Sequence, residues 1–343
     1  MVGRIWRLAT GTPRGRAIAI ASVVIVVAAL VATGIVLLGG GGGSPPKPRP
    51  RPTPTPTRPA VPLRSPFTGE LVKSLGPVLA VKIDNIVDAR PPTGLTAADI
   101  VYLLPVEGGL SRILAVFSSR FPPVIGPVRS SREDDLELLR QFGRPAFAYS
   151  GAQPQLVPVV HNARIVDLYA GIAGGYYRDP NRLMPHNLYA HTRQLVAEAH
   201  GASTAHDIGF RFGPAPPGGT VAASASAAYP AASFTFRWSA AKARWLVWMD
   251  GTPAGTTEDG QLGAATVVIQ YTTVRTSRFL EQGVRPPYAE TTGSGTALVL
   301  RDGKEWHAQW SRPNANVGTT FTTTSGQPMT FALGPVWIVL AAR

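Results

Sequence analysis

The sequence contains no cysteine. This absence excludes disulfides, thiolate metal sites, a cysteine nucleophile and a lipid-modified N-terminal cysteine. The sequence also has no G-x-S-x-G elbow, and no glycine-rich phosphate loop follows a predicted strand. No histidine and acid lie at a recognised zinc spacing. We therefore expect neither a cofactor nor a metal site.

Acidic residues are absent from the first 65 positions, which carry nine positive charges. Because the formal net charge is +13, the remaining chain carries only +4. That value is too small for a duplex-binding surface, and no nucleic-acid-binding motif is present. We expect no nucleic-acid partner.

The segment 17–38 is an uncharged apolar run of 22 residues. At about 1.5 Å per residue it is long enough to cross a hydrocarbon core of roughly 30 Å. A cleaved signal peptide has a shorter apolar stretch and a small-residue cleavage site. Four arginines precede the segment, which predicts a cytoplasmic N-terminus. We expect a basic tail over 1–16, an uncleaved single-pass anchor over 17–38, and an extracytoplasmic body.

A stalk rich in glycine and proline is predicted over 39–64. Its glycines are flexible, and its alternating prolines favour extended polyproline II. Spaced cations in the stalk are attracted to anionic lipids or to acidic wall polymers. The simpler alternative is a spacer with no other role.

The body changes character partway along the chain. Within 65–212, short apolar runs alternate with helix-like stretches, which predicts an α/β (α+β) N-terminal domain. Within 213–343 the runs are rich in β-branched and aromatic residues, and Asp302-Gly303 signals a hairpin, which predicts a mainly β C-terminal domain. Its tryptophans are expected in the core rather than on a sugar-binding face. The individual predictions are strands over 78–83, 112–119 and 145–151, and helices over 131–143 and 192–201.

Several long sequence motifs occur in order along the body. Through these motifs the body resembles the YerB family of extracytoplasmic bacterial proteins, whose domain has no assigned function. The resemblance covers nearly all of 65–343 and implies an envelope-facing protein with an α/β-type and then a β-type domain. Family members often carry a lipoprotein cysteine, which the apolar anchor replaces here. The matching strings are VKIDN (81–85), ARPPTGLTAADIVY (89–102), EGGLSRILAVF (107–117), IGPVRSSR (125–132), YRDPNRLMPHNLY (177–189), TTGSGTALVLRDGKEWHAQW (291–310) and GPVWIVL (334–340).

The string from Arg129 to the acids at 133–135 predicts the start of a helix. Ser131 is placed as its N-cap. Arg129, Ser130 and Arg132 are candidate ligand-binding residues, because arginines beside a helix start can hold a carboxylate or phosphate. The alternative is that the three acids already neutralise these arginines.

Asp84 and Glu107 are expected at strand ends, where they could act as general acid and base in glycan cleavage if about 5–9 Å apart. The alternative is structural: Asp84 caps a turn, and Glu107 pairs with Arg112 or Arg90.

His186 lies in a polar, loop-like stretch and could act as a base or bind a ligand. Arg178 and Asn187 are candidate ligand-binding partners beside it. His191 is expected to be a buried structural histidine.

Three hypotheses of function follow. The first is a membrane-anchored protein that binds an anionic or glycan component of the cell envelope. The second is a wall-acting hydrolase or transferase that uses Asp84 or Glu107 with His186, and the third is a scaffold for envelope assembly proteins. The expected partners are thus the membrane and a wall polymer or envelope protein. The residues expected to share one cleft are Asp84, Glu107, Arg112, Arg129, Arg132 and His186.

Overall fold

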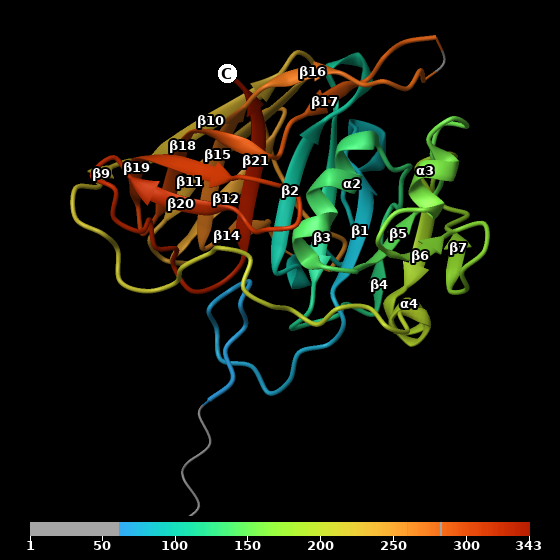
Figure 1. The fold of residues 1–343 in the computed structure, drawn as a ribbon, viewed down its shortest axis with the longest axis horizontal. Helices are drawn as coiled ribbons and strands as arrows, with labels where there is room; N and C mark the ends of the chain where they lie inside the picture. The colour runs from blue at the N-terminus through green and yellow to red at the C-terminus, as the bar shows by residue number, and fades with distance from the viewer. Residues whose placement is uncertain (1–61, 259, 282) are drawn as a thin grey trace, which may run out of the picture. The chain divides into compact units, whose positions relative to one another are not determined.

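In the computed structural model, an eleven-stranded mixed sheet forms the centre of the body (Figure 1). The structure describes residues 62–343 except 259 and 282, and these belong to one compact unit, Ala60–Arg343. The strands, in spatial order, are β20 (Thr320–Thr323), β19 (Lys304–Arg312), β18 (Gly293–Arg301), β15 (Thr266–Thr272), β21 (Val336–Ala342), β2 (Ile100–Pro105), β3 (Ser111–Phe117), β1 (Leu79–Asp84), β5 (Ala146–Tyr149) and β6 (Val166–Tyr169), with β9 (Thr220–Val221) paired to β19.

The predicted anchor and almost all of the predicted stalk lie outside the described residues. Within the part of the chain that is described, no helix combines the length and the apolar character needed to cross a bilayer.

The two halves of the body share this sheet through β21. This strand pairs in parallel with β15 on one side and with β2 on the other. Trp337 is therefore the register partner of both Val267 and Val101. Such a pairing between distant segments cannot be read from the local sequence pattern, which predicted each half separately.

Both faces of the sheet are buried, so its central strands are apolar along their whole length. Along β1, Leu79 and Val81 pack into one hydrophobic cluster, and Ala80 packs into another on the opposite face. All six residues of β1 are buried. This explains why VLAVKI is a continuous apolar run apart from Lys82.

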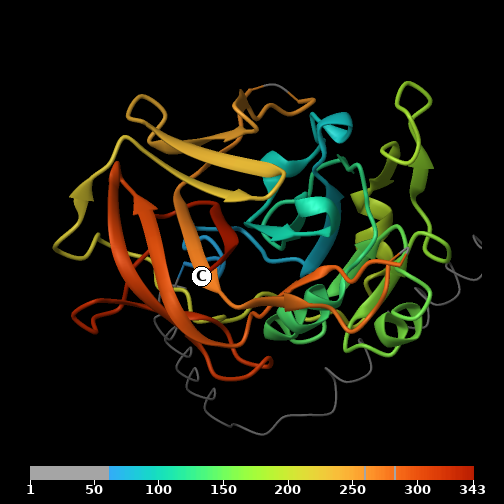
Figure 2. The same cartoon turned by 90° about the horizontal axis from the view of Figure 1, so that it is seen from above.

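A second sheet packs against the first face through Phe234, Phe236 and Trp245. Figure 2 shows it in yellow and orange on one side of the large sheet. A three-stranded sheet and α4 cover the same face farther along, through Leu188 and Leu195. These elements are β10 (Ser224–Tyr229), β11 (Ala232–Ser239), β12 (Arg244–Met249), β13 (Thr252–Pro253) and β14 (Gly263–Ala264); then β4 (Val124–Ile125), β7 (Tyr176–Arg178), β8 (Leu188–His191) and α4 (Thr192–Glu198).

The opposite face is covered by two short helices. Leu138 and Leu139 of α2 and Val160 of α3 pack there beside Phe67 and Phe210. A two-stranded arm from the C-terminal half runs past the start of α2 (Figure 1). These elements are α2 (Glu133–Leu139), α3 (Val157–His161), β16 (Val274–Thr276) and β17 (Pro287–Ala289), and the 3₁₀ turns are Val87–Ala89, Leu95–Ala97, Glu107–Gly109 and Arg140–Phe142.

The body is thus mostly β with few helices, and the described α-helices all fall within 65–212. The strands predicted over 78–83, 112–119 and 145–151 are confirmed as β1, β3 and β5. The predicted hairpin is confirmed, because Asp302 and Gly303 have φ values of +49° and +71° between β18 and β19. The expected core tryptophans include Trp245, Trp306, Trp310 and Trp337, each at most 5% exposed.

Candidate functional site

A cluster of charged side chains lies at the carboxyl ends of three strands that run in one direction. β1 is parallel to β5, and β1 and β2 are both antiparallel to the strand between them, β3. Asp84 ends β1, Glu107 follows β2, and Ser150 follows β5. In open sheets with parallel strands, ligands bind at this edge. The cluster is therefore our candidate site.

The segment that carries Arg129 and Ser130 is held between the ends of β1 and β5 by backbone hydrogen bonds. The Arg129 amide donates to the carbonyl of Lys82 over 2.8 Å, and the Ser150 amide donates to the carbonyl of Arg129 over 3.0 Å. As a result, the hydroxyl oxygens of Ser130 and Ser150 are 3.5 Å apart.

Asp84 is the centre of the cluster and is 2% exposed. Its Oδ2 lies 2.9 Å from Nε of Arg129 and 2.7 Å from Nδ1 of His186, a residue 102 positions away in the chain. Both partners are partly open to solvent, with side-chain exposures of 24% and 14%. Within the described chain, the terminal nitrogens of Arg129 and the Nε2 atom of His186 have no partner.

Arg112 lies opposite Asp84 across the β1–β3 pair, and its Nη1 donates to the carbonyl of Ser130 over 3.0 Å. Burial, together with the nearby charge of Arg132, lowers the pKa of Arg112 to about 10. The side chain is therefore still protonated at pH 7.

Glu107 forms a bidentate ion pair with Arg132 rather than pairing with Arg112 or Arg90. The two Glu107 oxygens accept from Nε and Nη2 of Arg132 over 2.5 and 2.9 Å. Burial alone would raise the pKa of Glu107, but the hydrogen bonds and charge of Arg132 outweigh it and lower that pKa. Glu107 is therefore ionised at neutral pH, which makes it a poor general acid.

In the described chain, the three acids that follow Arg132 form no ion pair with the guanidinium groups of Arg129 and Arg132. Glu133 accepts from Nε of Arg278 over 2.6 Å, and Asp135 accepts from Nζ of Lys82 over 2.6 Å. Asp134 is buried, and among the described residues its carboxyl group accepts a hydrogen bond only from the distant amide of Ala289, at 3.4 Å. In the described residues, the guanidinium groups of Arg129 and Arg132 instead pair with Asp84 and Glu107, and Glu281 lies 3.8 Å from Arg132.

The prediction that Ser131 caps this helix is wrong. α2 begins at Glu133 and its N-cap is Arg132, whose backbone amide donates to Oδ2 of Asp135 over 2.7 Å. The Ser131 hydroxyl donates to the carbonyl of Gly151 instead, over 3.4 Å. Because the first turn of α2 is buried, the start of the helix does not form the open anion cradle that the string suggested.

Because Asp134 is buried, we expect the stability of the protein to depend measurably on pH. Burial, with the charge of Asp135, raises the pKa of Asp134 from 3.8 to about 7. The folded state thus binds this proton more tightly than the unfolded state. The stabilising contribution of the bound proton is complete below about pH 4 and is lost as the pH rises to about 7. We expect Asp134→Asn to remove a slope of at most about 1.4 kcal/mol per pH unit from the free energy of unfolding.

Chemical denaturation at several pH values between 4 and 8 measures this slope in both proteins. Parallel pH profiles for wild type and variant would contradict the assignment of the slope to Asp134.

The remaining candidates brace the loop that carries His186. Nη1 of Arg178 donates to Oδ1 of Asn187 over 2.7 Å, and Nδ2 of Asn187 donates to the carbonyl of Asp179 over 3.1 Å. Arg178 is exposed, whereas Asn187 is buried. The expectation of a buried His191 is wrong, because this side chain is exposed and stacks on Tyr177 at a centroid distance of 5.0 Å.

The structure therefore brings Asp84, Arg112, Arg129, Ser130 and His186 together and joins Glu107 and Arg132 as a neighbouring pair. Sequence reasoning missed the buried pair of Lys82 and Asp135 beneath them, although a lysine inside an apolar strand run was a visible signal. Over residues 62–343, leaving out 259 and 282, no three histidine, aspartate or glutamate side chains are grouped as metal ligands.

Fold and site together define a two-part, mostly β protein with a charged cluster at the carboxyl ends of parallel strands. The family described as "Protein of unknown function (DUF3048)" matches this chain with its N-terminal domain over residues 67–205 and its C-terminal domain over 225–338. The chain belongs to this family.

Two comparisons with proteins of Bacillus subtilis agree with the family resemblance found in the sequence. The protein of strain 168 named "Putative lipoprotein YerB" is 41% identical over 96 residues, which span 27% of this chain and 28% of that relative. The crystal structure of YerB from Bacillus subtilis matches with a TM-score of 0.67 and 21% identity, over 81% of this chain and 96% of that one. The two proteins therefore share a fold.

Proposed function

We propose that this protein is a membrane-anchored extracytoplasmic protein that binds an anionic or glycan component of the cell envelope at the Asp84 cluster. The observation that carries the proposal is the double contact of Asp84 with Arg129 and His186. It orients both side chains and leaves their outer nitrogens without a partner in the described chain. A prearranged, partly exposed guanidinium group such as that of Arg129 is what an anion site needs.

The charge immediately around Asp84 favours an anion. Arg132 is matched by Glu107, with Glu281 nearby, whereas Asp84 alone faces both Arg112 and Arg129. A carboxylate or phosphate there would balance the second of the two arginines that share Asp84, and it could accept two parallel hydrogen bonds from Arg129. The hydroxyls of Ser130 and Ser150 add donors at the same edge.

A pocket beside this cluster offers space for a sugar. It has a volume of about 650 Å³, and Glu107 forms part of its wall. Tyr229, Pro230, Arg275 and Arg285 also line it, which supplies apolar surface together with charged donors. That combination suits a glycan that carries an acidic group.

The location is supported by the apolar segment 17–38 and by the printed name of the Bacillus subtilis relative, which calls that protein a lipoprotein. A body displayed outside the membrane would meet wall polymers and anionic lipids.

Isothermal titration of the full chain, in an uncharged detergent, with N-acetylmuramic acid tests the binding proposal, because this wall sugar carries a carboxylate. We expect Arg129→Ala to weaken binding roughly 10- to 100-fold, since it removes charge-assisted hydrogen bonds. Arg193→Ala is the matched control, because Arg193 is exposed and pairs with no other described residue. Equal affinity in Arg129→Ala and wild type, or no binding to this sugar or to wall material, would refute the proposal.

One observation favours an enzyme as the second candidate. A carboxylate that accepts from Nδ1 of a histidine orients the ring and leaves Nε2 free to take a proton, and Asp84 and His186 have this arrangement. This favours a site built on His186 over an acid–base pair of carboxylates, because Arg132 holds Glu107 ionised and so without a proton to donate.

Digestion of purified wall material, followed by mass spectrometry of the products, tests this candidate. A product that wild type releases and His186→Gln does not would support it. Unchanged material at several pH values and with several added metals would exclude it.

A further inference from the structure

A second concentration of cations lies where β21 begins, at the end of the large sheet opposite to the Asp84 cluster. One pocket of about 670 Å³ is lined by Arg64, Arg244 and Arg301, and a second of about 250 Å³ is lined by Arg120, Lys242 and again Arg244. Because Arg244 belongs to both, the two pockets adjoin. We call them together the basic groove.

Three of these cations, Arg64, Arg244 and Lys242, have no carboxylate partner among the described residues. Nη1 of Arg64 donates to the carbonyl of Gly69, and Nη1 of Arg244 donates to the carbonyl of Ala243, in each case over 2.9 Å. Their other nitrogens make no hydrogen bond or ion pair in the described chain, and the same holds for the side chain of the exposed residue Lys242. The exposed Arg120 differs, because its charge acts on the buried carboxyl of Asp99.

Two acids also line the groove. Asp302 is paired with Arg301 at 2.8 Å, so its charge is already compensated. Among the described lining residues, Glu70 is then the one uncompensated acid against the three cations Arg64, Lys242 and Arg244. A groove with this excess of positive charge attracts anions.

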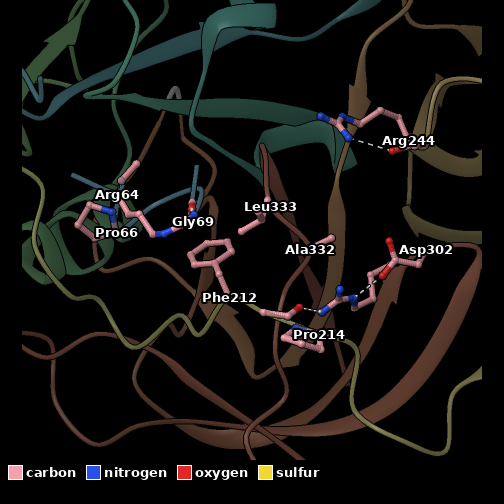
Figure 3. Close-up of a pocket in the computed structure, with 13 residues that line it drawn as sticks. Arg64, Pro66, Gly69, Phe212, Pro214, Arg244, Asp302, Ala332 and Leu333 are labelled. Atoms are coloured by element: carbon pink, nitrogen blue, oxygen red, sulfur yellow. Dashed lines mark hydrogen bonds and ion pairs between the residues drawn. The ribbon is translucent and has the colours of Figure 1, made fainter. Parts of the chain in front are cut away.

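The larger pocket has an apolar strip between its cations. Figure 3 shows Arg64 on one side and Arg244 on the other, with Phe212 and Leu333 between them. A ligand that reaches both arginines must therefore carry at least two negative groups separated by a segment that tolerates apolar contact. Phosphates linked by a short carbon chain meet this requirement, and each matches the planar donors of an arginine.

The groove is separate from the Asp84 cluster. Pro335, which precedes β21, lines the groove, whereas Ala342, which ends β21, lines the pocket beside Glu107. The seven residues of β21 lie between them, and at about 3.3 Å per residue the two sites are roughly 20 Å apart.

We propose that the basic groove is a second binding site, for a polyol phosphate chain that lays successive phosphates on Arg64 and Arg244 and its carbon segments on Phe212 and Leu333. The same chemistry occurs in a soluble or wall-bound polymer and in the headgroup of an anionic glycerophospholipid.

Titration calorimetry of the full chain in an uncharged detergent, with a short poly(glycerol phosphate) as the probe, tests this site. We expect Arg244→Gln to weaken binding roughly 10- to 100-fold and Arg64→Gln roughly 10-fold. Each variant should also reduce the slope of log affinity against log salt by about one. The matched control is Arg193→Gln, which should bind like wild type.

Further probes distinguish a lipid headgroup from a polymer, and phosphates from carboxylates. Stronger binding to mixed micelles that contain phosphatidylglycerol than to the polymer would support the groove and assign it to lipid headgroups. Equal binding to polyglutamate of the same charge would overturn the assignment to phosphates. Binding that Arg244→Gln leaves intact would overturn the site itself. If that variant does not fold, Arg64→Gln at an exposed position decides, and unchanged affinity there rejects the groove.

Discussion

Replacement of Lys82 by methionine is expected to lower the free energy of unfolding by about 3–5 kcal/mol. Lys82 and Asp135 form an ion pair of 2.6 Å in which both side chains are fully buried. Methionine fills the space of the lysine but leaves the carboxylate of Asp135 without its cation in a region that water does not reach. The loss is large because the uncompensated charge, rather than the lost contact, sets its size.

Chemical denaturation of the full chain measures this effect, and the double variant Lys82→Met/Asp135→Asn is its control. The asparagine side chain introduced at position 135 would still accept the amide of Arg132, so neutralising both partners should recover about half of the loss or more. Arg211→Met breaks an exposed ion pair and should cost at most about 1 kcal/mol. If Lys82→Met is no more harmful than Arg211→Met, then the pair beneath the site is not what holds the strand ends in place.

Replacement of Trp337 by alanine is expected to cost about 3–5 kcal/mol and to destabilise both halves of the body together. Trp337 is 2% exposed, lies between Val101 and Val267 in register, and approaches Phe236 of the second sheet edge to face at 6.5 Å. Its removal leaves a cavity where three elements meet.

Hydrogen exchange provides the measurement, because it reports β1 and β3 separately from β18 and β19. We expect faster exchange in both groups of strands. Trp248→Ala is the control, because Trp248 is only half-buried and stacks on Arg237 at 4.5 Å. We expect its replacement to lower the free energy of unfolding by about 1 kcal/mol. Faster exchange in the C-terminal strands alone would show that β21 does not couple the halves.

Local structure was largely predictable from the sequence, because apolar runs, turn residues and helix signals act over a few neighbouring positions. The strand VLAVKI and the hairpin at Asp302-Gly303 are examples. The error at Ser131 has a tertiary cause: the carbonyl of Gly151, just after β5, takes its backbone amide and its hydroxyl, so the N-cap lies one residue later, at Arg132. Strand order was not predictable, because it depends on pairing between residues hundreds of positions apart.

The candidate site was predictable as a set of residue types but not as a geometry. The sequence placed Asp84, Arg129 and His186 in polar strings at strand ends or loops. Only the fold shows that one carboxylate oxygen contacts both of the other side chains, and that Glu107 is held by Arg132. The basic groove had no sequence signal, because its cations are single residues from separate segments.

The position of β21 has a consequence for biosynthesis. This strand fills the gap between β15 and β2, so the large sheet is complete only after residues 336–342 have left the ribosome. Until then, the edge of β2 presents unpaired backbone groups next to strands that are apolar on both faces. A chain that stops before these residues therefore exposes an aggregation-prone edge in its N-terminal half, far from the missing segment in sequence. Quality control in the cell must protect or degrade such a chain.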